Sequence, residues 1–409
     1  MGSGLFVAGH HRNACVRAQV VTATSENALY PKSNLQNGFP WKPFRFNTAG
    51  VDLEVKFDAN LLTVAETGFE TYSTGAAPGG RWSTLAGTPT VELAPAAGHG
   101  ANSLQLNAAG ESSGIDLELA AGRNYGINFS LYANGGEFID VYVLNLETGK
   151  YRTSSSWTTT KTALQTHSAA SWSNYILNIL AEPLTWGYIG GAARHRIFAE
   201  KRSGTATAFI DDVQVFPYCS FASMHNYSEI PDGLSVLVQS SPDDSTWTTR
   251  GTLAAGRRFR NYISFTVQVQ RYWKFLISGT TLFIPSIGQT VLAEAITFIT
   301  KPSWGMVTAR KMPKLGRDDL PLSLAASPRY RFEMSWESKY SAYQQIADEM
   351  LGASNFGDEP ILIIPDVVDL EVVYGRGARL SSIDARSIPI DTWEYSLTLE
   401  DDAYSVLTK

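Results

Sequence analysis

The chain is poor in cysteine, with only Cys15 and Cys219 among its 409 residues. A disulfide scaffold needs a denser set of cysteines, and these two lack the spacing of a zinc finger. Both fall in segments that we assign below to one domain, so they could lie near each other. We nevertheless expect reduced thiols, which suits folding in a cytoplasm.

Long apolar runs and basic runs are also missing. The N-terminal run Leu5–Ala8 is too short for a signal-peptide core, and no span of about 18 apolar residues occurs anywhere. We therefore expect no membrane insertion. The net charge is -6, and the densest basic stretch is Arg257–Arg260. Because phosphate binding needs clustered Lys and Arg, specific nucleic-acid binding is disfavoured.

Catalytic motifs are absent as well. The sequence contains no Gly-x-Ser-x-Gly elbow, no Ser-x-x-Lys and no zincin pair of histidines. Its acidic pairs are Asp211-Asp212 and Asp243-Asp244. Neighbours on a strand face opposite ways, so neither pair makes an acid and base couple by itself. We expect no catalytic residues and no enzymatic activity.

Aromatic and apolar residues, by contrast, are abundant. The hydrophobic fraction is 44%, and the chain has 10 Trp and 18 Tyr. This length and composition predict two to four folded domains. Short alternating runs separated by turn formers predict a mainly β fold. The clearest is Val51–Phe57, whose residues Val51, Leu53, Val55 and Phe57 should share one face.

The order of several short motifs resembles a discoidin (F5/8 type C-like) domain as it occurs in bacteriophage tail proteins. The motifs are Ala28–Pro31, Asn34–Gly38, Val51–Phe57, His225-Asn226, Val238–Trp247 and Arg271–Lys274. They fall in two pieces, 1–62 and 217–285. The resemblance therefore implies a β-sandwich that is split by an insertion. Such an insertion is tolerated where the guest has its own core and adjacent termini.

The segment between the pieces, 63–216, resembles a carbohydrate-binding module of the jelly-roll type. The resemblance is carried by Gly68–Glu70, Trp82, Gly100–Leu104, Gly122–Tyr125, Trp172 and Ile210–Val213. In such modules acidic residues of the opening and closing strands hold a structural Ca²⁺, which implies a site at Glu70 with Asp211 or Asp212. The alternative is that these carboxylates are exposed or bind loop amides. We expect no helix in this segment.

Sugar binding needs flat aromatic side chains for the apolar sugar face and polar groups for the hydroxyls. The candidates in the insert are Tyr132, Tyr142, Tyr151, Trp157, Trp172, Trp186 and Tyr188. Trp157 lies in a polar Ser/Thr run, and Trp186 and Tyr188 flank Gly187 in an expected loop. We predict these three as the glycan platform. The alternative is that they plug the ends of the sandwich or contact a neighbouring subunit. Trp82 and Trp172 match core-type positions of the resembled family.

The last segment, 286–409, resembles the tube-like domain of phage distal and minor tail proteins. The resemblance is carried by Tyr330–Glu333, a helix predicted over 336–351, Glu359–Asp366, Val373–Gly375 and Trp393–Glu400. The helix is expected to follow an N-cap at Ser335 and to stop at Gly352. The segment should thus be a small α+β domain, of a family whose members form rings at the end of the tail tube.

Together the resemblances imply a structural protein of a tailed-phage tail tip, assembled in the host cytoplasm and located in the virion. Its expected partners are tube, hub and tape-measure proteins, further copies of itself in a homo-oligomeric ring, and a host cell-surface glycan. The alternative is a non-catalytic lectin-like module of a bacterial surface or polysaccharide-binding system. A third interpretation, a glycoside hydrolase, would need two inward carboxylates at a cleft.

Overall fold

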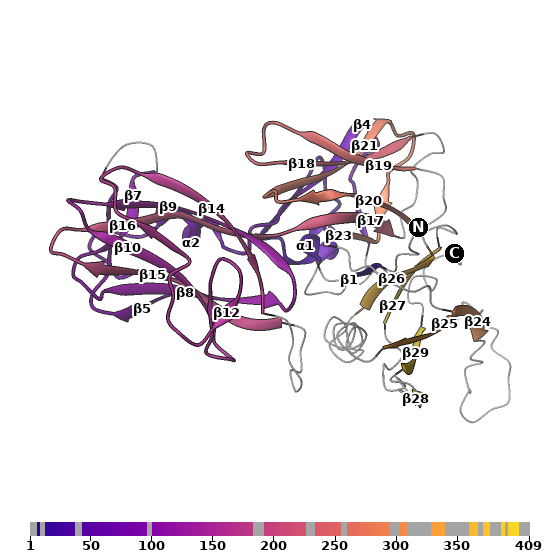
Figure 1. Ribbon diagram of the computed structural model, residues 1–409. Helices are drawn as coiled ribbons and strands as arrows, with labels where there is room; N and C mark the ends of the chain where they lie inside the picture. Colours follow the sequence, from indigo (N-terminus) through magenta and orange to yellow (C-terminus); the bar gives the residue numbers. More distant parts are fainter. Residues whose placement is uncertain are drawn as a thin grey trace, which may run out of the picture. The chain divides into compact units, whose positions relative to one another are not determined.

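The computed structural model (Figure 1) is dominated by β-strands. It describes residues 6–8, 13–36, 43–95, 100–182, 192–225, 234–254 and 260–294, and C-terminal strands at 303–309, 329–339, 360–366, 371–376, 386–388 and 392–400. Helical segments in these residues are short: α1 (Ala14–Arg17), η2 (Lys32–Gln36) and α2 (Val64–Gly68). The predicted mainly β class is confirmed. In this part of the chain no helix has the length and apolarity to cross a membrane.

The chain divides into two compact units. Unit 1 includes Met1–Asp58 and Cys219–Lys409, and unit 2 includes Ala59–Pro183 and Ala192–Tyr218. In the sequence, unit 2 therefore lies between two pieces of unit 1. The finer division into four domains stays a prediction.

Unit 2 contains two antiparallel sheets. The seven-stranded sheet holds β12 (Trp157–Thr158), β11 (Tyr151–Arg152), β10 (Phe138–Asn145), β15 (Ala192–Ser203), β8 (Ser112–Ala120) and β5 (Trp82–Ala86), with β13 (Gln165–His167) beside β10. The five-stranded sheet holds β14 (Ser173–Leu180), β9 (Asn124–Ala133), β16 (Ala208–Pro217), β7 (Asn102–Leu106) and β6 (Thr90–Leu93). The chain changes sheet from β8 to β9 to β10, and again from β14 to β15 to β16. This alternation is the connectivity of a jelly roll.

The core of unit 2 lies between these sheets. Alternate residues of β8 and β9 point into it and are almost fully buried, among them Ile115, Leu117, Ile127 and Phe129. Each such side chain contributes roughly 1.5–3 kcal/mol when it leaves water. The intervening residues occupy the outer faces of the sandwich, as the period of two requires. Any ligand site formed by sheet residues must therefore lie on these outer faces.

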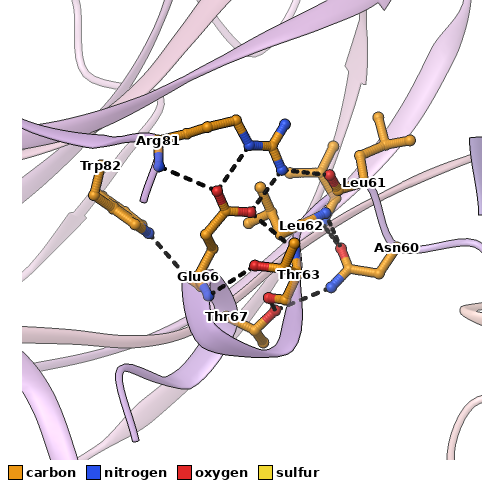
Figure 2. A network of polar contacts seen from close by, with 9 residues as sticks. Asn60, Leu61, Leu62, Thr63, Glu66, Thr67, Arg81 and Trp82 are labelled. Carbon is orange, nitrogen blue, oxygen red and sulfur yellow. Dashed lines mark hydrogen bonds and ion pairs between the residues drawn. The ribbon is translucent and has the colours of Figure 1, made fainter. Parts of the chain in front are cut away.

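The first turn of unit 2 is fixed by a polar network around α2 (Figure 2). Thr63 is the N-cap, and it forms a capping box with Glu66. Burial alone would raise the pKa of the Glu66 carboxyl, but hydrogen bonds from Arg81 and Thr63 outweigh it and hold that pKa at about 2. The Trp82 indole donates to the Glu66 carbonyl oxygen at 2.8 Å. The expectation of no helix in this segment was wrong, because a five-residue helix fixed by its cap is too short to show helical periodicity.

The beginning and end of unit 2 lie side by side. The backbone N–H of Leu61 donates to the Val215 carbonyl at 2.7 Å. The Val215 N–H donates to the Asn60 side chain at 2.9 Å. Adjacent ends allow a complete module to be inserted into one loop of another domain.

The strands of unit 1 that flank unit 2 in the sequence form three small sheets. The five-stranded sheet has the order β19 (Thr248–Ala254), β18 (Ser235–Ser241), β21 (Tyr272–Thr280), β4 (Val51–Asp58) and β2 (Val20–Ala23). A three-stranded sheet joins β20 (Arg260–Gln268), β17 (Cys219–His225) and β23 (Gln289–Ala293), and a pair joins β22 (Ser286–Ile287) to β3 (Phe44–Arg45). The pairing of β4 with β21 joins chain segments from either side of unit 2.

The predicted alternation in β4 is correct except at its start. Leu53, Val55 and Phe57 are buried, but Val51 is 62% exposed. Asp52 has a φ of 53°, and the register with β21 shifts at this end of the strand. This irregularity breaks the alternation, so Val51 does not share the buried face.

Another sheet of unit 1 holds the C-terminal strands. Its order is β1 (Phe6–Ala8), β26 (Pro360–Asp366), β27 (Glu371–Arg376), β29 (Thr392–Glu400), β25 (Arg329–Lys339) and β24 (Ser303–Ala309), with β28 (Arg386–Ile388) beside β29. The first strand of the chain thus pairs with β26, although the sequence assigned it to the first domain.

The prediction that a helix begins at Trp336 was wrong, because the first residues of the expected helix form a strand. Trp336 lies in β25 and pairs with Tyr395 of β29, and β25 continues to Lys339. The alternation of Tyr330 and Phe332 extends through Trp336, so pairing with β29 prolongs the strand. The remainder of the predicted helix, residues 340–351, lies outside the described residues.

Candidate functional site

Trp157, the first predicted glycan residue, lies in β12 and is half-buried rather than in an exposed loop. Its ring packs on the hydrophobic core, and its Nε1 donates to the Leu180 carbonyl at 3.1 Å. The ring also lies 5.4 Å from the buried His195 ring. These contacts match the alternative that this side chain plugs the sandwich. Its predicted role in glycan binding stays a prediction.

The other aromatic candidates lie in different surroundings. Trp186 and Tyr188 are outside the described residues. Trp82 is 4% exposed, as expected for a core position. Trp172 is half-buried, and its ring lies 5.6 Å from that of Tyr132 on the five-stranded sheet.

Two of the three predicted calcium residues, Asp211 and Asp212, lie in the closing strand β16. Asp211 is fully buried, and its Oδ1 accepts from the Asp212 N–H at 2.8 Å. Asp212 has a φ of 51°, which breaks the pairing of β16 with β9 at this point. The Glu70 carboxylate is exposed and accepts from the N–H groups of Ala101 and Asn102 at 2.8 and 3.3 Å.

The fit of these residues to a calcium ion is partial. Asp211 Oδ2 is buried without a hydrogen-bond partner, which a hard cation could satisfy. Burial is the largest of the effects that raise the pKa of the Asp211 carboxyl to about 9. The charges of Asp212 and Glu70 act in the same direction, and the hydrogen bond from the Asp212 N–H opposes them. Among the described residues, however, no three His, Cys, Asp or Glu side chains are grouped to hold a metal ion. Glu70 binds loop amides, as the alternative expected, and calcium binding at these residues stays a prediction.

The outer face of the seven-stranded sheet carries an aromatic stack. Tyr142 of β10 and Phe198 of β15 are directly opposite each other, and their rings stack at 4.8 Å with an interplanar angle of 15°. Tyr151 meets Tyr142 edge-on at 6.2 Å. Gly114 of β8 is the next residue across the sheet, and a Cβ there would lie 2.6 Å from the Phe198 Cβ. The missing side chain at Gly114 therefore makes room for Phe198.

Two carboxylates lie beside this stack. Asp140 and Glu200 are directly opposite each other on β10 and β15. Arg202 holds Asp140 through two hydrogen bonds of 2.6 Å, and Thr166 donates to the same carboxylate at 2.6 Å. Asp140 is 1% exposed, whereas 52% of the Arg202 side chain is exposed. The exposed hydrogen-bond donors of Arg202 thus lie next to the buried carboxylate oxygens of Asp140.

Lys161 completes the arrangement. Its Nζ lies 4.9 Å from the centre of the Tyr142 ring and 5.8 Å from that of Phe198. The same ammonium pairs with Glu200. We call these seven residues the outer-face cluster: Asp140, Tyr142, Tyr151, Lys161, Phe198, Glu200 and Arg202. Burial raises the pKa of the Tyr142 hydroxyl, and the negative charges of Asp140 and Glu200 raise it further.

The sequence identified only Tyr142 and Tyr151 of this cluster as candidates. The short run Phe138–Leu144 predicts a strand, and the period of two of a strand separates Asp140 and Tyr142 from Ile139 and Val141. The same alternation in β15 separates Phe198, Glu200 and Arg202 from the core side. What the sequence does not state is that β10 and β15 are neighbours.

Several solved carbohydrate-binding structures are similar to this chain. The CBM22-1 xylan-binding domain from Paenibacillus barcinonensis Xyn10C has 15% identity and a TM-score of 0.26, with 37% of this chain and 91% of that chain covered. TmCBM61 in complex with β-1,4-galactotriose has 18% identity and a TM-score of 0.25, with 38% and 97% covered. The arabinose-bound α-L-arabinofuranosidase MgGH51 has 12% identity and a TM-score of 0.29, with 39% of this chain and only 26% of that chain covered.

These similarities do not by themselves decide a function, because every identity is low and every TM-score is far below that of a shared whole-chain fold. No sequence-family profile matches the chain, and no curated protein matches it. The outer-face cluster is therefore a candidate site on the basis of its contacts alone.

Proposed function

We propose that this chain is a non-catalytic glycan-binding protein and that the outer-face cluster of unit 2 is its sugar site. The observation that carries the proposal is the Tyr142–Phe198 stack with charged and hydroxyl groups at its edge. Aromatic rings bind the apolar face of a sugar, while carboxylates and Arg bind its hydroxyls. Both kinds of group occur here on one face of one sheet.

A binding role suits this cluster better than hydrolysis. Asp140 and Glu200 are opposite each other on β10 and β15, and a glycosidase uses two carboxylates. Each of them, however, is held by its own cation, Arg202 or Lys161. Two carboxylates that are each already engaged in an ion pair do not form the free acid and base couple of a glycosidase.

We also propose that the protein belongs to the tail tip of a tailed phage, on the sequence resemblances of 1–62, 217–285 and 286–409. In that setting it would assemble with tube, hub and tape-measure proteins and form a homo-oligomeric ring. Repetition around the ring would convert weak sugar contacts into useful avidity. The alternative is a lectin-like module of a bacterial surface or polysaccharide-binding system.

Immunogold electron microscopy of phage particles with an antibody to this chain tests the location. Gold at the tail tip is expected. Unlabelled particles, with the protein free in the medium or on cells, would overturn the tail proposal and favour the lectin.

A glycan array probed with the full chain tests the sugar site. Binding should fall in Tyr151→Ala, because Tyr151 is half-buried at the edge of the stack. Ile176→Ala is the control, because Ile176 is 69% exposed on β14 of the other sheet. Equal losses in both variants, or none in Tyr151→Ala, would place the site elsewhere.

A structural Ca²⁺ at Glu70, Asp211 and Asp212 is a further part of the proposal. It is supported by the unpaired, buried Oδ2 of Asp211. Bound there, the ion would supply positive charge to a carboxylate that is otherwise buried without a cation. Its test is thermal stability with and without added Ca²⁺.

A further inference from the structure

The outer-face cluster already contains an amine. The Lys161 ammonium lies over Tyr142 and Phe198, and it pairs with Glu200. Tyr142 and Phe198 are only 7% and 6% exposed as whole residues, whereas 43% of the Lys161 side chain is exposed. Lys161 is thus the exposed member of this group, and its ammonium lies over two residues that are themselves buried.

An ammonium suits this position for two independent reasons. The faces of aromatic rings carry negative charge and attract cations within about 6 Å. The neighbouring carboxylates add to that attraction, and they are not equally neutralised. Asp140 keeps Arg202 as its partner in any case, but the cation that Glu200 has in the structure is Lys161.

From this arrangement, and resting on the proposed glycan function, we propose that the cluster binds a sugar that carries a free amino group. The sugar's ammonium takes the place of the Lys161 ammonium over Tyr142 and beside Glu200, while the sugar ring lies along the stack. Lys161 is then an internal competitor that leaves when the ligand enters.

A neutral sugar would bind less well at this position. It would have to displace Lys161 from Glu200 without supplying a positive charge in its place. The partly buried carboxylate of Glu200 would then lose its ion-pair partner. Only 22% of the Glu200 side chain is exposed, so water replaces that partner incompletely. An amino sugar restores both the cation–π contact and the ion pair.

The test measures the full chain by calorimetry against short glucosamine oligomers and against N-acetylglucosamine oligomers of matched length. Wild type should prefer the free amine. Lys161→Ala removes the competitor and should raise affinity for the amine by roughly 5- to 30-fold, the combined scale of one cation–π contact and one surface ion pair. Glu200→Gln should abolish the preference for the amine.

Arg194→Ala is the matched control, because Arg194 pairs with Glu147 on the same face and its loss changes the net charge equally. It should leave the affinity unchanged. Thermal melts establish that each variant is folded.

The outcomes separate the two proposals. Equal or tighter binding of the N-acetylated oligomer, or of other neutral glycans on the array, would overturn the amine inference and leave the glycan function standing. An unchanged affinity in Lys161→Ala would likewise overturn the role of Lys161. If neither wild type nor Lys161→Ala binds any glycan, the proposed function fails and the inference fails with it.

Discussion

Asp211→Asn should make unit 2 more stable at neutral pH in the absence of metal. Burial raises the pKa of the Asp211 carboxyl to about 9 in the folded protein, against about 3.9 in an unfolded chain. At pH 7 the folded state therefore holds a proton that the unfolded state has released. Keeping that proton costs at most about 4 kcal/mol at pH 7, from about 1.36 kcal/mol per pH unit over roughly three units.

The sign follows from proton binding. The folded state binds more protons than the unfolded state between about pH 4 and pH 9, so the free energy of unfolding falls as the pH rises through this range. The contribution of Asp211 is fully present below about pH 4 and is lost as the pH approaches 9. An Asn side chain keeps the shape and does not titrate. Burying the unpaired amide donors of Asn costs about 1–3 kcal/mol. Subtracting this cost from the roughly 4 kcal/mol of the retained proton leaves a net gain in the free energy of unfolding of about 1–3 kcal/mol at pH 7.

Urea unfolding of wild type and Asp211→Asn in EDTA, at several pH values between 5 and 8.5, measures the effect. The difference in unfolding free energy between the two proteins should widen in favour of Asp211→Asn as the pH rises. Parallel pH profiles, or a variant that is the less stable protein at pH 8, would refute the reasoning.

Added Ca²⁺ should stabilise wild type relative to Asp211→Asn if Asp211 is its ligand. A cation that binds the folded state alone stabilises it by about 2.7 kcal/mol at a concentration 100 times its Kd. It should also displace the Asp211 proton and flatten the pH profile of wild type. Asp211→Asn should not respond. Equal stabilisation of both proteins would show that Ca²⁺ binds elsewhere.

Three further changes have defined outcomes. Glu66→Gln removes the charged partner of Arg81 in the capping network and should lower the free energy of unfolding by about 1.5–3 kcal/mol in a urea titration, and an unchanged midpoint would contradict this. Gly114→Ala places a Cβ 2.6 Å from the Phe198 Cβ, so it should lower the free energy of unfolding by about 1–3 kcal/mol and weaken glycan binding. An unchanged melting temperature would show that the sheet accommodates the added methyl group. Burial lowers the pKa of the His195 imidazole, so the unfolded state takes up a proton before the folded state as the pH falls below about 6.5. Wild type should therefore lose stability toward pH 5 relative to His195→Gln. Identical pH profiles of the two proteins would refute this.

Local sequence patterns correctly predicted individual strands and the buried residues within them. The alternation in Val51–Phe57 correctly identified the buried residues Leu53, Val55 and Phe57 of β4. The run Phe138–Leu144 was likewise expected to be a strand, and β10 spans Phe138–Asn145. These predictions succeeded because a period of two is a property of the backbone and needs no partner.

Two of the wrong predictions have a common cause. The helix expected from Trp336 is a strand at that residue, because pairing with β29 prolongs β25. Trp157 was expected to be an exposed loop residue, but its ring packs on the core and its indole N–H meets the Leu180 carbonyl. In both cases a segment elsewhere in the chain decided the outcome, and local sequence does not contain that segment.

The sequence by itself determined the mainly β class, the absence of familiar catalytic motifs and the sets of residues that share a face. Only the tertiary structure placed β10 beside β15, which brings Asp140 opposite Glu200 and Tyr142 opposite Phe198. Only the fold buried Asp211 without a partner for its Oδ2. The physical reason is that periodicity fixes which side chains point the same way, whereas the pairing of distant strands fixes which of them meet.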